Sequence, residues 1–207
     1  MSPIDTAPID AAAARSEVIA RALAKATDAH AGQVRNGSGG LSYIEHPRMV
    51  AATLAQLGYP DSTLAAALLH DVVEDSDTTV EDLRGEFSDV IAGLVAALSD
   101  DETIENYCER KDEHRGRVAG VDGDALAIYA ADKLTNLTTL HETIAREDPA
   151  KVADEFRVPL ELKVEVWEAD SRMLHREAPD LPLLGRLDGA ISLLREDLAL
   201  AAPRRGT

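Results

Sequence analysis

Residues 67–75 read Ala-Leu-Leu-His-Asp-Val-Val-Glu-Asp, so four ionisable groups end an apolar segment of helical character. Positions three and four apart on a helix share a face, which places His70 beside Glu74. Asp71 lies beside both Glu74 and Asp75 for the same reason. Burying one imidazole and three carboxylates is costly unless other charge compensates them, and a divalent metal ion, which accepts nitrogen and oxygen ligands, is the simplest compensation. The stretch therefore predicts half of a metal site with catalytic carboxylates beside it.

The composition favours a single all-α domain. A chain of 207 residues can build one domain with its own core and is short for two. Ala and Leu, both strong helix formers, dominate the sequence, whereas aromatic residues make up only 3%. Runs of alternating β-branched residues, which would indicate strands, are missing from the sequence. We expect residues 1–10, which contain Pro3 and Pro8, to be a disordered N-terminal tail, and residues 11–202 to form the domain.

Helical periodicity and capping residues predict where the helices lie. Thr79 is an expected N-cap with Asp82 at capping-box spacing, and Asp61 is an expected N-cap for the helix that ends at His70. The polar segment 99–124 is the least core-like part of the chain, and such segments are often mobile or functional. The remaining helices are expected over residues 11–31, 47–58, 124–141, 149–176 and 188–201.

Charge and cysteine content restrict the partners. A formal net charge of −17 argues against a nucleic-acid partner, because binding to a phosphate backbone depends on clustered Lys and Arg. An acidic protein can still bind a small phosphorylated ligand if a metal ion and a few cations lie close by. The single Cys108 excludes an intramolecular disulfide framework. With no apolar run of about 20 residues and no signal-like N-terminus, we expect a cytoplasmic protein that binds no membrane.

Four residues form the predicted metal site: His46, His70, Asp71 and Asp132. His46 precedes Pro47 at an expected helix start, and Asp132 interrupts an apolar stretch of a later helix. Two imidazoles and two carboxylates suit Mn²⁺, Fe²⁺ or Zn²⁺, with water in the open positions. Taken singly, each residue is equally well explained as a satisfied core histidine or as a capping aspartate. The four together favour the metal site.

Glu74 and Asp75 are the candidate catalytic acid and base. A carboxylate beside a metal site can orient a water molecule or take its proton, and can later protonate a leaving group. The alternative is a solvated acidic turn before Thr79, which would be preferred if the pair did not follow the predicted ligands so closely.

Two further residues are candidates for binding a substrate. Asn136 lies one helical turn after Asp132 and could donate a hydrogen bond to a ligand, or could be satisfied locally. Arg35 precedes a glycine-rich stretch and could stack on a base or bind a phosphate. The densest basic cluster, within residues 110–117, is interleaved with acidic residues and fits a phosphate contact or a solvated helix face equally well.

The order of these motifs resembles that of the HD-domain metal-dependent phosphohydrolases. Within them, the chain is most similar to alarmone (ppGpp) hydrolase domains of the RelA/SpoT type, above all the small stand-alone hydrolases. The resemblance implies an all-helical fold, Mn²⁺ bound by the four predicted ligands, and a water molecule activated by Glu74 and Asp75. The implied reaction is hydrolytic removal of the 3′-pyrophosphate from guanosine tetra- or pentaphosphate. The motifs that carry the resemblance are residues 30–35 (HAGQVR), 43–47 (YIEHP), 66–75 (AALLHDVVED) and 131–137 (ADKLTNL).

The chain departs from that family at substrate-binding cations. Asn36 stands where the family usually has Lys, Tyr129 where it usually has another Lys, and Thr138 where it usually has Arg. Each lost charge-assisted hydrogen bond is worth about 1.5–3 kcal/mol, so three losses could change the substrate. Two alternatives therefore stay open beside a ppGpp hydrolase. One is a phosphohydrolase of another nucleotide, such as the 2′-phosphate of NADPH or a nucleoside monophosphate, and the other is a non-catalytic nucleotide sensor.

Overall fold

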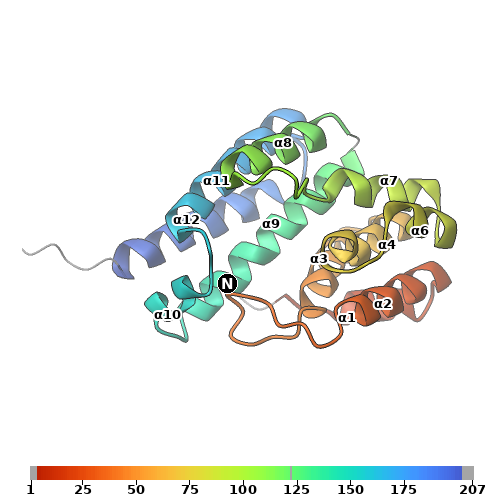
Figure 1. Ribbon diagram of the computed structural model, residues 1–207, viewed down its shortest axis with the longest axis horizontal. Coiled ribbons are helices and arrows are strands. Elements are labelled where there is room, and N and C mark those ends of the chain that lie inside the picture. Colours follow the sequence, from red (N-terminus) through yellow and green to blue (C-terminus); the bar gives the residue numbers. More distant parts are fainter. Residues whose placement is uncertain (1–3, 122, 202–207) are drawn as a thin grey trace, which may run out of the picture.

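The protein is all-α, as its sequence predicts. The structure is a computed structural model that describes residues 4–121 and 123–201, where the only β-type pairing is an isolated bridge between Val34 and Ser42. Within the described residues, no helix is both long enough and apolar enough to cross a lipid bilayer. The helices, labelled in Figure 1, are α1 (Ala7–Ala13), α2 (Glu17–Ala29), α3 (Glu45–Gln56), α4 (Asp61–Leu69), α5 (Val72–Asp75), α6 (Val80–Glu86), α7 (Asp89–Leu98), α8 (Tyr107–Ala119), α9 (Gly123–Ile144), α10 (Pro149–Asp154), α11 (Leu160–Glu177) and α12 (Leu184–Ala201).

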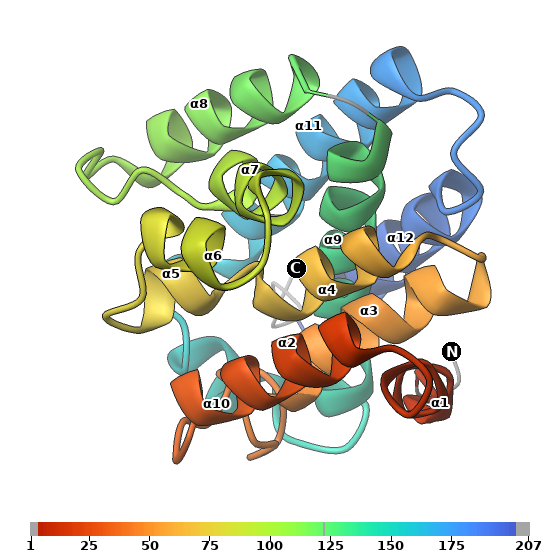
Figure 2. The same ribbon diagram turned by 90° about the vertical axis from the view of Figure 1, so that its right-hand side faces the viewer.

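The long helix α9 is the centre of the fold. It runs between the N-terminal helices, of which α3 and α4 contact it, and the C-terminal helices α11 and α12 (Figures 1 and 2). Nearly every residue of α9 from Ala125 to Leu140 is buried, which is the pattern of a helix packed on all sides. Helix α4 is also buried on every side from Thr63 to Leu69. These two helices therefore hold their polar residues in the interior, where the site is built.

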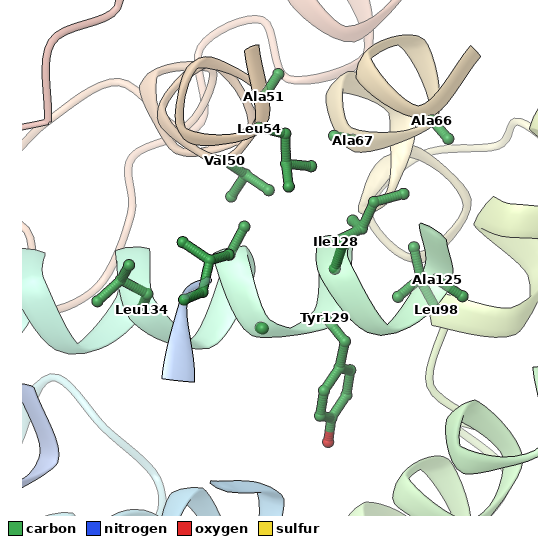
Figure 3. Close-up of a cluster of buried hydrophobic side chains, with 14 of the residues drawn as sticks. Val50, Ala51, Leu54, Ala66, Ala67, Leu98, Ala125, Ile128, Tyr129 and Leu134 are labelled. Atoms are coloured by element: carbon green, nitrogen blue, oxygen red, sulfur yellow. The ribbon is translucent and has the colours of Figure 1, made fainter. Parts of the chain in front are cut away.

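The core between α3, α4 and α9 consists of aliphatic side chains. Figure 3 shows Ile128 of α9 on the side that faces Val50, Leu54 and Ala67, whereas Tyr129 points the opposite way. All of these side chains except Tyr129, at 1%, are completely inaccessible to solvent. Burial of this apolar surface fixes the relative positions of the three helices.

The N-terminal region differs from the sequence-based expectation. Residues 1–3 lie outside the described part of the chain, but residues 7–10 are helical, so the prediction of a disordered tail to residue 10 is wrong. Ile9 is completely buried in the core, and Arg48 binds the Asp10 carboxylate at 2.8 Å. These tertiary contacts stabilise a helix that its short sequence would not form alone. The expected helix 11–31 is consequently two helices, which separate at Ser16.

Other helix ends also differ from those expected. The helix that contains His70 and Asp71 is interrupted at these two residues, so α4 and α5 are separate. Pro60, and not Asp61, is the N-cap of α4. The expected helix 149–176 divides into α10 and α11. The polar segment 99–124 contains the 13-residue helix α8.

The capping box at the start of α6 is confirmed. Thr79 accepts a hydrogen bond from the Asp82 amide at 3.1 Å, and the Asp82 carboxylate accepts one from the Thr79 amide at 2.9 Å. Both orphan donors at this helix end are thereby satisfied.

Ile128→Ala tests the central position of α9. The substitution removes three buried carbon atoms, and we expect the free energy of unfolding to fall by about 2–5 kcal/mol. Urea unfolding followed by circular dichroism measures the change. Val90→Ala is the matched control, because Val90 is 61% exposed on α7, and its effect should stay within about 0.5 kcal/mol. An equally small effect of Ile128→Ala would contradict this description of the core.

Candidate active site

Three of the four predicted metal ligands meet at one point. His46 from the start of α3, His70 from the end of α4 and Asp132 from the middle of α9 place their ligand atoms within 4.8 Å of one another. His46 Nε2 lies 3.3 Å from His70 Nε2 and 3.1 Å from Asp132 Oδ1. The fourth predicted ligand, Asp71, places Oδ1 3.1 Å from His70 Nε2 and Oδ2 3.7 Å from His46 Nε2. Residues far apart in the sequence thus form one cluster.

The donor atoms of this cluster suit a divalent cation. His70 Nδ1 lies 2.8 Å from the Ala67 carbonyl oxygen and donates to it, so in neutral His70 the Nε2 lone pair faces the cluster. His46 also presents Nε2 to the cluster, while its buried Nδ1 has no hydrogen-bond partner within the described residues. Two nitrogen and two carboxylate ligands converging in a buried place are a set that Mn²⁺, Fe²⁺ or Zn²⁺ can accept. These residues therefore fit a divalent metal ion.

The two histidines have opposite pKa shifts in this cluster. Burial is the main reason why the pKa of His46 falls to about 4, so His46 is neutral at neutral pH. Burial also acts to lower the pKa of His70, but the Asp71 and Asp132 carboxylates outweigh it and raise that pKa to about 9. Without a metal ion, a proton on His70 supplies part of the positive charge that the carboxylates require.

Asp71 and Asp132 are each held by neighbouring groups. The Tyr43 hydroxyl donates to Asp71 Oδ2 at 2.9 Å, and Arg35 lies 3.9 Å from the same oxygen. Lys133 contacts Asp132 Oδ2 at 2.7 Å. Burial acts to raise the pKa of Asp132, but Lys133 and the two histidines outweigh it and hold that pKa well below its usual value. Both carboxylates are therefore ionised and fixed in orientation.

The two predicted substrate-binding residues contact each other. Arg35 donates to the Asn136 side-chain oxygen, and Asn136 Nδ2 donates to Asp132 Oδ1 at 2.7 Å. The Arg35 guanidinium also lies 5.1 Å from the centre of the Tyr43 ring. Hydrogen bonds thus link Arg35 through Asn136 to the cluster of predicted metal ligands.

A cavity of about 380 Å³ opens beside the cluster, a volume in the range of small-molecule sites. Its wall includes His70, Asp71 and Asp132 together with residues from α8 and α11. Glu74 lines this cavity, whereas Asp75 does not and is exposed to solvent. Both carboxylates belong to α5, where adjacent residues point in different directions, so only Glu74 faces the cavity.

Glu74 is fixed by one hydrogen bond and has an unusual pKa. The Asp100 amide donates to Glu74 Oε1 at 2.8 Å, which leaves Oε2 available to a water molecule. Burial, with a further contribution from the Asp71 carboxylate, raises the pKa of Glu74 to about 7. A carboxyl group with such a pKa can both accept and donate a proton near neutral pH.

The segment 99–124 contributes several residues to the cavity wall, of which Asp100 and Tyr107 were not candidates from the sequence, whereas Lys111 and His114 belong to the basic cluster considered above. Asp100, Tyr107, Lys111 and His114 all line the cavity. Asp100 contacts Lys111 Nζ at 2.5 Å and His114 Nδ1 at 2.7 Å, and these contacts hold its pKa below the usual value although burial acts to raise it. The length and polarity of this segment, and its basic cluster, were the sequence signals of its part in the site.

The basic cluster within residues 110–117 is neither a free phosphate site nor a purely solvated face. Arg115 binds the buried Asp170 carboxylate at 2.8 Å, and Arg117 binds Glu113 at 3.0 Å. Only Lys111 and His114 of this cluster reach the cavity.

The three positions that depart from the resembled family lie in different surroundings. Asn36 lines the cavity. Tyr129 also lines it, and its hydroxyl donates to Asp170 Oδ1 at 2.9 Å. Thr138 is buried away from the cavity wall. The loss of positive charge therefore affects the cavity at positions 36 and 129.

Comparison with known proteins identifies the family. The model of the HD domain matches residues 22–158. The chain belongs to the HD domain family. The HD domain resemblance noted in the sequence is thereby confirmed, and the match includes every predicted ligand and both candidate catalytic carboxylates.

Several relatives carry the name that the resemblance implied. A guanosine-3′,5′-bis(diphosphate) 3′-pyrophosphohydrolase of Aquifex aeolicus (strain VF5) is 33% identical over 162 residues, which are 76% of this chain and 23% of that protein. The protein MESH1 of Danio rerio, with the same enzyme name, is 35% identical over 118 residues, which are 56% of this chain and 65% of MESH1. The chain thus spans about a quarter of the Aquifex protein and about two thirds of MESH1.

Solved structures share the fold. A metazoan ortholog of SpoT, described as hydrolysing ppGpp, matches with a TM-score of 0.70 and 27% identity, over 87% of this chain and 96% of that one. The protein lmo0812 of Listeria monocytogenes EGD-e matches with a TM-score of 0.66 and 26% identity, over 73% of this chain and 99% of that one.

His70→Ala tests the predicted metal site. The substitution removes one of the two predicted imidazole ligands. Loss of a residue that only hydrogen-bonds to a metal ligand typically lowers metal affinity by about 10- to 100-fold, so we expect Mn²⁺ affinity to fall by about 100-fold or more. Calorimetric titration with Mn²⁺ and metal analysis of the purified protein measure the effect, while circular dichroism checks folding. His175→Ala removes an exposed histidine of α11 and should bind Mn²⁺ as the original protein does. Undiminished Mn²⁺ binding by His70→Ala would refute the assignment.

Proposed function

We propose that this protein is a divalent-metal-dependent phosphohydrolase that removes the 3′-pyrophosphate, or a phosphate, from a guanosine alarmone such as ppGpp. The observation that carries the proposal is the meeting of His46, His70, Asp71 and Asp132 beside a cavity that Glu74 also lines. The enzyme names of the Aquifex and Danio relatives, and the activity described for the metazoan SpoT ortholog, support the choice of substrate.

The two histidines and two aspartates would hold the metal ion. Mn²⁺ is the ion that the family resemblance implies, and the same ligands also suit Fe²⁺ or Zn²⁺. A bound divalent ion supplies a Lewis acid for a phosphoryl oxygen and lowers the pKa of a water molecule.

The neighbouring residues divide the remaining tasks. Glu74, through Oε2, accepts a proton from the attacking water, whose oxygen bonds to phosphorus as the bond from phosphorus to the ribose 3′ oxygen breaks. The proton then passes to that leaving oxygen, and pyrophosphate is released. Asp75, which faces solvent, exchanges protons with Glu74 or with bulk water. Arg35 and Asn136 hold the phosphate oxygens next to the ligand cluster.

A less highly charged nucleotide is the second candidate substrate. Asn36 and Tyr129 bring no charge to the cavity wall, and Lys133 is paired with Asp132. A substrate with a single phosphate, such as the 2′-phosphate of NADPH or a nucleoside monophosphate, requires fewer cations. A non-catalytic sensor is the third candidate, but a sensor has no use for a carboxyl group with the position and pKa of Glu74.

A panel of nucleotides assayed with Mn²⁺ distinguishes these functions. The panel contains ppGpp, pppGpp, NADPH and simple 3′- and 5′-monophosphates, and the release of pyrophosphate or phosphate is measured. The proposal predicts the highest kcat/KM for ppGpp or pppGpp. Preference for NADPH or a monophosphate would establish the second candidate, and tight binding of ppGpp without turnover would establish a sensor.

Glu74→Gln tests the proton transfer. The amide keeps the shape of the side chain but cannot accept a proton, so kcat should fall by about 100-fold or more while Mn²⁺ affinity stays within a few-fold. Steady-state kinetics and calorimetry measure the two quantities. Glu196→Gln changes an exposed carboxylate on α12 and should leave kcat unaltered. An undiminished kcat in Glu74→Gln would return Glu74 to the solvated acidic turn considered above.

A further inference from the structure

Lys163 of α11 lines the cavity and is surrounded by aromatic rings. Its Nζ lies 5.0 Å from the centre of the Phe156 ring, 5.6 Å from that of Tyr107 and 5.6 Å from that of Trp167. These rings come from three different segments of the chain. The ammonium group is therefore held in one position by cation–π contacts.

Within the described part of the chain, Lys163 has no carboxylate within salt-bridge distance and no hydrogen bond. The other lysines of the cavity wall differ in this respect. Lys111 contacts Asp100 at 2.5 Å, and Lys133 contacts Asp132 at 2.7 Å. Acidic residues outnumber basic ones by 38 to 21 in this protein, so an unpaired cation in a largely enclosed place requires an explanation.

The surroundings of Lys163 make its charge costly in the free protein. Burial, followed by the charges of Lys111 and Lys133, lowers the pKa of Lys163 to about 8. That value still leaves the side chain mostly protonated at neutral pH. An anion bound beside Lys163 would pair with its ammonium group and offset the cost of burying that charge.

The loop that contains Gly37 helps to hold this arrangement. Gly37 has a positive φ of 68°, and a Cβ atom placed on it would lie 2.4 Å from Phe156 Cζ. The Gly37 amide donates to Glu155 Oε2 at 2.6 Å. The loop after Arg35 thus contacts the ring that neighbours Lys163.

We propose that Lys163 is a specificity-determining residue that binds a phosphate group of the nucleotide other than the one being cleaved. In a guanosine alarmone this group is the 5′-diphosphate. Arg35 and Lys133 contact Asp71 and Asp132, whereas Lys163 makes no salt bridge to any of the four predicted ligands, so we assign the phosphate at the cluster to Arg35 and the other phosphate to Lys163. Lys163 then supplies charge that Asn36 and Tyr129 do not. This inference rests on the proposed function.

A pair of substrates and a set of variants test the proposal. The substrates are ppGpp and guanosine 3′-diphosphate, which has a free 5′-hydroxyl group. For Lys163→Met we expect a rise of about 10- to 100-fold in the KM for ppGpp, with kcat changed only a few-fold. The KM for guanosine 3′-diphosphate should change less than about 3-fold, because that substrate lacks the phosphates in question. Lys163→Arg should restore most of the affinity for ppGpp, and Lys151→Met, which alters an exposed lysine of α10, should behave like the original protein.

Equilibrium binding keeps the test independent of turnover. Calorimetric titration of metal-free protein with the two nucleotides measures affinities even if neither is hydrolysed, and the Kd for ppGpp alone should rise in Lys163→Met. Absence of turnover by the original protein would refute the proposed function, while the Kd values would still decide the role of Lys163. Equal losses for both nucleotides, or no loss for either, would overturn the inference and leave Lys163 a structural residue.

Discussion

Two imidazoles and two carboxylates occupy a small buried volume where α3, α4 and α9 meet, and their charges must be balanced. The His46 and His70 Nε2 atoms face each other at 3.3 Å, with Asp71 and Asp132 beside them. Hydrogen bonds from neighbouring groups orient His70, Asp71 and Asp132, and His46 is buried. Only a proton or a cation between them makes such an arrangement acceptable in a low-dielectric interior. The apolar packing of α4 and α9 imposes this requirement, since it brings the four side chains together.

The cavity beside the cluster combines paired and unpaired charges. Lys111 and Lys133 each bind a carboxylate, so these cations of the cavity wall mainly orient acidic groups. Glu74 and Lys163 are the groups whose charge is not compensated in this way, and burial shifts both pKa values toward neutrality. Under the proposed function, a nucleotide with phosphates at two positions would contact both the cluster and Lys163.

The sequence predicted the all-α fold, because residue type and local spacing determine it, whereas the catalytic roles of Glu74 and Asp75 stay predictions. It placed His46 and Asp132 in the same site only through ligand chemistry and resemblance, and the roles of all four ligands stay predictions. Helix ends at Ser16 and at His70–Asp71 depend on tertiary contacts such as the burial of Ile9, which no local pattern shows. Lys163 was missed for a similar reason: its aromatic neighbours are distant in the sequence.

The most direct test of the central claim is anomalous diffraction at the manganese edge from crystals of the full chain equilibrated with Mn²⁺. The account predicts one ordered ion within coordination distance of His46 Nε2, His70 Nε2 and carboxylate oxygens of Asp71 and Asp132. An ion bound elsewhere, or no anomalous peak at this cluster in crystals saturated with Mn²⁺, would contradict it.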